Sequence, residues 1–159
     1  MTVDAQCSLA PDCVSTAEDA EKQRNAEETR LMNVNEINVR TAQIVDAAMK
    51  VHSTLGPGLL ESAYEACLAY ELRKRGLRVV RQPLLPVMYD DVEIELAYRL
   101  DLVVDDVVIV ELKTVRRLLP IHEAQLLSYL KLSHHRVGLL INFRQVRLKN
   151  GIKRMVHRL

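Results

Sequence analysis

Residues 99–113 read RLDLVVDDVVIVELK and decide the centre of the fold. Aliphatic and β-branched residues fill both sides of Asp105-Asp106, a pair of residue types that is common in tight turns. The stretch therefore predicts two antiparallel strands, over residues 94–104 and 107–113, joined at the aspartates.

The length of this turn decides which side chains share a sheet face. A two-residue turn would leave Asp101 and Glu111 on opposite faces, because side chains alternate along a strand. A three-residue turn that includes Val107 makes Asp101 oppose Glu111, with their Cβ atoms about 5 Å apart. The other face is then wholly aliphatic: Leu100, Leu102, Val104, Val108, Val110 and Leu112. Burial of that face favours the second register, so we predict an odd-length turn or bulge.

Upstream of this hairpin, apolar residues recur at helical spacing over 35–55 and 59–76, and each run ends at glycine. These runs predict an N-terminal helical hairpin, followed by short β-rich segments at 77–81 and 84–89. Together with 94–104 and 107–113, these segments predict an antiparallel meander.

Downstream, Pro120 precedes a predicted helix over 121–132, and the apolar run 137–143 predicts a strand buried on both faces. Asn150-Gly151 predicts a hairpin between 146–148 and 152–156. The expected fold class is α/β, or α+β, with a mixed sheet flanked by helices.

The chain has 159 residues, of which 48% are hydrophobic, and this suits one domain with a substantial core. Residues 1–32 are rich in Ala, Glu, Asp, Ser and Thr and contain no aromatic residue, so we expect a disordered acidic tail before a domain over 33–159. The chain has no apolar run of about 18 residues and three cysteines without metal-site spacing. We therefore expect a cytoplasmic protein that does not enter a membrane.

The net charge of +1 hides a strong asymmetry along the chain. Residues 113–159 hold eleven Lys and Arg against one acid, Glu123, which leaves a net charge of +10. This part is either a phosphate-binding surface or a solvated face balanced by acids elsewhere. Low aromatic content favours electrostatic over stacking contacts with nucleic acid. The candidate backbone contacts are Arg116, Arg117, Lys131, Arg144, Arg147, Lys149, Lys153 and Arg154.

Asp101 and Glu111 would supply the hard oxygen ligands that Mg²⁺ or Mn²⁺ prefers, and Lys113 would hold an attacking water beside the metal. Gln125 and Tyr129 lie four apart, so they share one face of the predicted helix and would line the same pocket. The alternative is an ordinary ion pair between Glu111 and Lys113 on a solvated strand.

The acid on one strand, the Glu111-x-Lys113 pair on the next and the Gln125-xxx-Tyr129 helix resemble the PD-(D/E)xK nuclease superfamily, particularly its RecB-like branch. Upstream, Gly58-Leu-Leu-Glu-Ser-Ala-Tyr64 matches the signature of the GxxExxY proteins. The resemblance runs from about residue 34 to the C-terminus, although Leu100 stands where the superfamily often has proline. It implies a restriction-endonuclease-like core, nuclease activity on DNA or RNA, and Glu61 as a third metal-binding carboxylate.

Two other functions remain open. The domain could bind nucleic acid or a protein without cutting, or act as a homo-oligomer whose exposed edges pair with a second copy. Tyr64 is expected to be a core aromatic with a satisfied hydroxyl. His122, at the start of the predicted helix, and His134-His135 are expected on the surface.

Overall fold

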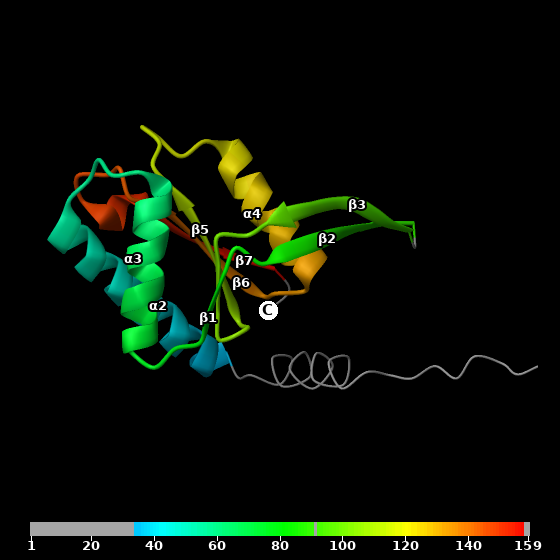
Figure 1. The fold of residues 1–159 in the computed structure, drawn as a ribbon, viewed down its shortest axis with the longest axis horizontal. Helices are drawn as coiled ribbons and strands as arrows, with labels where there is room; N and C mark the ends of the chain where they lie inside the picture. The colour runs from blue at the N-terminus through cyan, green and yellow to red at the C-terminus, as the bar shows by residue number, and fades with distance from the viewer. Residues whose placement is uncertain (1–33, 91, 158–159) are drawn as a thin grey trace, which may run out of the picture. The chain divides into compact units, whose positions relative to one another are not determined.

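A computed structural model of the protein describes residues 34–90 and 92–157 (Figure 1). The acidic tail predicted over residues 1–32 lies outside the described residues. Within these described ranges, three α-helices surround a central sheet: α2 (Val34–Leu55), α3 (Glu61–Lys74) and α4 (Pro120–Ser133). In the described part of the chain, no helix combines the length and apolarity needed to cross a membrane.

The central sheet has five strands in the order β1-β4-β5-β6-β7. Their bounds are β1 Val79–Arg81, β4 Leu102–Val104, β5 Val108–Lys113, β6 Val137–Asn142 and β7 Ile152–Val156. β5 and β6 run parallel, with α4 between them in sequence, and the other neighbours are antiparallel. The C-terminal ends of β5 and β6 therefore lie at the same edge of the sheet.

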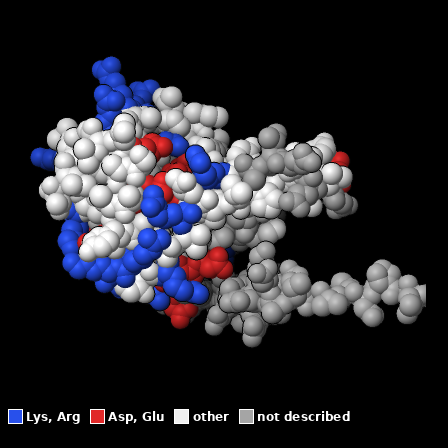
Figure 2. All heavy atoms as spheres, viewed as in Figure 1, with Lys and Arg blue, Asp and Glu red and all other residues white. Residues whose placement is uncertain are grey.

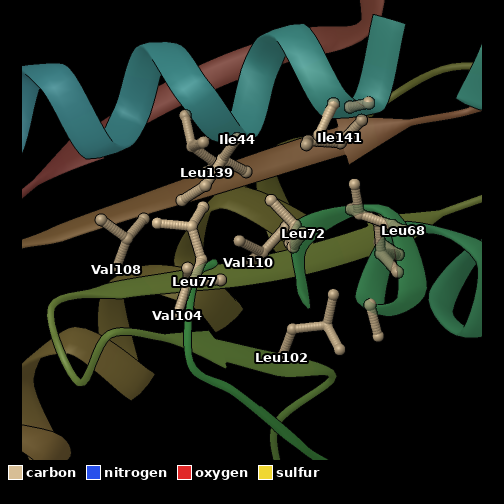
Figure 3. Close-up of a cluster of buried hydrophobic side chains, with 14 of the residues drawn as sticks. Ile44, Leu68, Leu72, Leu77, Leu102, Val104, Val108, Val110, Leu139 and Ile141 are labelled. Carbon is tan, nitrogen blue, oxygen red and sulfur yellow. The ribbon is translucent and has the colours of Figure 1, made fainter. Parts of the chain in front are cut away.

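Each sheet face is covered by a different helical layer. The helices α2 and α3 bury the aliphatic face, where Ile44, Leu68 and Leu72 pack against β4, β5 and β6 (Figure 3). α4 packs on the other face, where Leu126 and Leu130 join Ile109 and Leu140 in a second cluster. The alternation of side chains in β5 thus separates an aliphatic face from the face that carries Glu111.

The turn between β4 and β5 has the predicted odd length. Leu102 pairs with Val110 and Val104 with Val108, so three residues connect the two strands. Asp105 and Asp106 both have positive φ, 52° and 59°, and the amide of Val107 donates to the Val104 carbonyl at 3.0 Å. The register inferred from burial of the aliphatic face is confirmed.

The predicted meander is wrong, because the segment 94–104 is not one strand. β2 (Leu84–Tyr89) and β3 (Val92–Arg99) form a separate two-stranded sheet, while β1 pairs with β4. Gln82 has φ of 52° and turns the chain out of the central sheet after β1. The Gln82 amide donates to the Asp101 carbonyl at 2.9 Å. This hydrogen bond joins the two chain segments that connect the hairpin to the central sheet.

The hairpin predicted at Asn150-Gly151 is also wrong. These residues belong to the 3₁₀ helix η1 (Leu148–Gly151), and β7 pairs with β6. Leu148 is buried in the core, which draws the segment inward. A Cβ on Gly151 would lie 2.6 Å from the Asn142 carbonyl oxygen, so this close approach of two backbone segments requires glycine.

Candidate active site

The site lies on the α4 face of the sheet, at the end of β5. Asp101 immediately precedes β4, and the observed register sets it beside Glu111. The Leu112 amide donates to Asp101 Oδ2 at 2.7 Å, and Lys113 Nζ donates to Glu111 Oε1 at 2.6 Å. Asp101, Glu111 and Lys113 therefore converge in one place, as the sequence predicts.

Glu111 has a carboxylate oxygen that the fold leaves unpaired. The residue is 3% exposed, and its Oε2 is buried without a hydrogen-bond partner among residues 34–90 and 92–157. Burial, followed by the negative charge of Asp101, raises the pKa of Glu111 to about 7, although Lys113 opposes the shift. An ionised oxygen in this position is costly until a cation or proton satisfies it.

The neighbouring groups keep Lys113 charged. Burial acts to lower the pKa of Lys113, but the hydrogen bond and charge of Glu111 outweigh it and raise the pKa. Burial also raises the pKa of Asp101, against the Leu112 amide and the charge of Lys113. The site thus combines a protonated lysine with two carboxyl groups that burial destabilises as anions, and a divalent cation would relieve that cost.

Glu61 contributes to the site from the first turn of α3. Its Oε2 accepts a hydrogen bond from the Thr114 amide at 3.0 Å, so it holds the backbone just beyond Lys113. After the larger effect of burial, its negative charge acts to raise the pKa of Asp101, of Glu111 and of Lys113. The role that the geometry shows is therefore to position the end of β5.

The loop before α3 is fixed by Tyr64. Its hydroxyl donates to the Gly56 carbonyl at 2.5 Å and accepts from the Leu59 amide at 3.2 Å. Its ring is fully buried and stacks on Phe143, with the ring centroids 4.4 Å apart. The prediction of a core tyrosine with a satisfied hydroxyl is confirmed, and its contacts set where α3 begins.

Gln125 and Tyr129 share one face of α4, as predicted. Gln125 Nε2 donates to the Tyr129 hydroxyl at 2.6 Å, so the two side chains bond to each other. Tyr129 is buried, and its pKa is raised first by burial and then by the charge of Glu111. Tyr129 thus lies on the helix that covers the sheet face carrying Glu111, and its hydroxyl is held by Gln125.

Two of the histidines have clear local roles. His122 Nδ1 accepts a hydrogen bond from the Leu119 amide at 3.1 Å and so caps the start of α4. His134 is exposed and ends α4 in the left-handed conformation, while His135 is half-buried. The surface position predicted for His134 is confirmed.

Asn142 is an important residue that sequence reasoning missed. It is fully buried at the end of β6; its Nδ2 donates to the Val115 carbonyl at 2.7 Å, and its Oδ1 accepts from the Val115 amide at 3.1 Å. The same Oδ1 accepts from the Arg144 amide at 3.3 Å. Asn142 therefore ties together the loops that follow β5 and β6. The signal for it was a single polar residue closing an apolar strand.

A second missed residue, Glu65, is buried one helical turn beyond Glu61. Its two carboxylate oxygens accept from Arg81 Nε at 2.8 Å and from Gln82 Nε2 at 2.9 Å. Since the Gln82 amide bonds to the Asp101 carbonyl, Glu65 connects α3 to the segment that presents Asp101.

The eight basic residues proposed for nucleic-acid contact do not form one surface. Lys153 faces α4 and pairs with Glu123, whereas Arg154 Nη2 donates to Asn38 on α2, on the opposite face, at 3.1 Å. Lys131 lies in the last turn of α4, away from the sheet edge that holds the site. Figure 2 shows Lys and Arg atoms distributed around a patch of acidic atoms on the visible face. The remaining five follow β5 or β6 at the edge of the site: Arg116, Arg117, Arg144, Arg147 and Lys149.

The donor set suits a metal that needs few protein ligands. Within residues 34–90 and 92–157, no group of three or more His, Cys, Asp and Glu side chains is arranged to hold a metal ion. Mg²⁺ commonly uses one or two carboxylates and keeps several waters. Asp101 and Glu111 fit that requirement, and the unpaired Oε2 of Glu111 is the atom that would gain most from such a ligand.

Comparison with known proteins agrees with this geometry. A family model described as the PD-(D/E)XK nuclease superfamily matches residues 38–155, which include every candidate site residue on α3, β5 and α4. No curated protein and no solved structure matches the chain significantly. The five-stranded mixed sheet flanked by helices is consistent with a restriction-endonuclease-like fold. The chain belongs to the PD-(D/E)XK nuclease superfamily.

Proposed function

We propose that the protein is a nuclease that hydrolyses phosphodiester bonds in DNA or RNA with Mg²⁺ or Mn²⁺. The observation that carries this proposal is the buried, unpaired Oε2 of Glu111, placed beside Lys113 and near Asp101. A structural ion pair would need only Lys113 and one carboxylate. The additional buried acid is explained by a cation that the site binds.

Asp101 and Glu111 would hold the metal. The metal would neutralise the negative charge that builds on the phosphate during hydrolysis. Lys113 donates hydrogen bonds and lies half-buried beside Glu111, so it can orient a water molecule for attack. The hydroxyl of Tyr129, held by Gln125, can hydrogen-bond to a phosphate oxygen or to that water.

The basic loops that follow β5 and β6 would contact the phosphate backbone on either side of the scissile bond. These contacts are electrostatic and independent of base identity, so we expect binding to weaken steeply with salt. Since neither loop contains Trp, Tyr or Phe beyond the buried Phe143, base stacking contributes little.

We also propose that the chain is of the GxxExxY type within the superfamily. Each residue of the signature has a distinct structural role: Gly58 has φ of 120°, Glu61 holds the Thr114 amide, and Tyr64 fixes the preceding loop. A direct metal contact from Glu61 and a RecB-like ancestry stay predictions. Cys67 is a free thiol, which suits the reducing cytoplasm where we propose that the protein acts.

The test is cleavage of single- and double-stranded DNA and RNA with Mn²⁺, Mg²⁺ or EDTA. We expect metal-dependent fragments from the native protein and at least about 100-fold slower cleavage by Lys113→Met, because water orientation contributes that much. Lys131→Met is the matched control, since it removes an exposed lysine at the far end of α4. Activity that persists in Lys113→Met would contradict the proposal. A metal-independent mobility shift without fragments would favour the non-cleaving binding module.

A further inference from the structure

The hairpin formed by β2 and β3 extends away from the central sheet (Figure 1). Its base is anchored: Leu85 is buried in the cluster under α4, and the ring centroids of Tyr98 and Tyr129 lie 5.4 Å apart. A two-stranded ribbon is at best marginally stable in water unless a further element covers it. An element that covered the outer half of this ribbon would therefore stabilise it.

The outer half of the hairpin presents large apolar side chains to solvent. Tyr89 and Val92 pair across the two strands near the tip and are 69% and 59% exposed. Leu85 and Tyr98 pair in the same way at the base, and the register shifts between these two pairs, at Pro86 and Val87. Exposed apolar residues occur on both sides of the ribbon: Leu84, Met88, Tyr89, Val92, Ile94 and Tyr98. Exposed apolar side chains gathered on one projecting element are typical of a site of protein association.

Charge excludes nucleic acid as the partner of this surface. Residues 83–98 contain four acids, Asp90, Asp91, Glu93 and Glu95, and no Lys or Arg. An acidic, apolar ribbon repels a polyanion, whether it is nucleic acid or an anionic membrane. The strands also carry no lysine to protect their edges from pairing with another strand.

We propose that this hairpin joins two copies of the chain, packed antiparallel around a two-fold axis. That arrangement places opposite charges against each other at the two ends of the ribbon, because exposed Asp90 stands at the tip and exposed Arg99 at the base. Antiparallel packing sets the acidic tip of one copy against Arg99 of the second copy, twice per dimer. A parallel arrangement would bring the acidic tips together, which electrostatic repulsion disfavours.

The two-fold arrangement buries the apolar residues of both hairpins in one interface. The interface is isologous, so the same residues serve both copies and no second complementary surface is needed. Because Tyr98 contacts Tyr129, the dimer would brace the wall of the candidate active site. Dimerisation through the hairpin does not depend on whether the protein cleaves nucleic acid.

The first experiment measures mass by sedimentation equilibrium over about 1–100 μM, a range that brackets typical weak and moderate association. We expect the native 18.1-kDa chain to form a dimer, and the double variant Tyr89→Ser/Val92→Ser to be monomeric while keeping the circular dichroism spectrum of the folded protein. Tyr70→Ser is the matched control, since Tyr70 on α3 is 68% exposed yet lies outside the hairpin, and it should remain dimeric. A monomeric native protein, or a dimer that survives the double variant, overturns the proposal.

A charge-reversal cycle tests the antiparallel geometry. Arg99→Asp should weaken the dimer by about fivefold for each exposed pair lost, and Asp90→Arg should do the same. Combining the two substitutions in one chain should restore the native affinity, because each tip again meets an opposite charge at the partner's base. Failure of the combined variant to recover affinity refutes the antiparallel arrangement.

Discussion

Replacing Glu111 by glutamine should stabilise the metal-free protein at pH 8, even though it removes a candidate catalytic group. The carboxylate is buried beside Asp101, and its pKa rises from 4.5 to about 7. That difference corresponds to a penalty of up to about 3 kcal/mol for holding the ionised group in the folded state. Glutamine has the same shape and can still accept the hydrogen bond from Lys113, but it carries no charge.

The pH dependence follows from the sign of the shift. Since the folded-state pKa lies above the unfolded value, the penalty is complete above pH 7 and fades as the pH falls towards 4.5. We therefore expect Glu111→Gln to exceed the native protein by about 1–3 kcal/mol at pH 8. The two should converge near pH 5.

The assay is urea unfolding in EDTA, followed by circular dichroism at both pH values. Glu71→Gln provides a control of opposite sign, because hydrogen bonds from Lys50 and Arg75 lower the pKa of Glu71. Its contribution to stability is present above its unfolded pKa and lost in acid, so this substitution should destabilise the protein at pH 8. A Glu111→Gln protein no more stable than the native one at pH 8 would show that the buried Glu111 carboxylate does not destabilise the fold.

Three further predictions follow from individual contacts. Asn142→Ala should cost about 1–3 kcal/mol in urea unfolding, because it leaves buried backbone groups of the two loops unpaired. Tyr64→Phe should cost about 1–2 kcal/mol in the same assay, since the loop before α3 loses both contacts to the hydroxyl. Arg144→Ala should lower the slope of log affinity against log salt concentration by about 1, the value for one lost phosphate contact. Arg154→Ala, on the opposite face, should leave that slope unchanged. Fluorescence anisotropy across a NaCl series measures both. Equal effects of the two substitutions would contradict the conclusion that Arg144 lies beside the site and Arg154 does not.

The register of β4 and β5 was predictable from sequence because only one register buries every aliphatic residue. Six such side chains depend on it, and no compact fold could expose them all. Since Asp101 and Glu111 occupy the alternate positions, their meeting followed from the same argument. The site was thus predictable where hydrophobic burial determines it.

The departure of the β2–β3 hairpin from the central sheet was not predictable in this way. Residues 94–104 have a strand-like pattern throughout, and the break depends on a positive φ at Gln82 and on its bond to Asp101. The backbone conformation of Gln82 and its hydrogen bond to Asp101 both depend on contacts between segments far apart in the sequence. A residue without a strong left-handed preference gives no local signal for such a turn.

The basic residues show a similar limit. Arg144 and Arg154 are close in sequence and equally basic, but the parallel pairing of β5 with β6 and the reversal into β7 send them to different parts of the surface. Charge counted along the chain predicts a basic region. Only the topology shows which of its residues lie beside the site.

Anomalous diffraction from crystals soaked in Mn²⁺ would locate the ion itself. We expect a manganese peak at bonding distance, about 2.2 Å, from Oε2 of Glu111 and from a carboxylate oxygen of Asp101, with Lys113 beside it. A protein that cleaves nucleic acid in Mn²⁺ yet binds the ion elsewhere, leaving Glu111 Oε2 unliganded, would contradict this expectation.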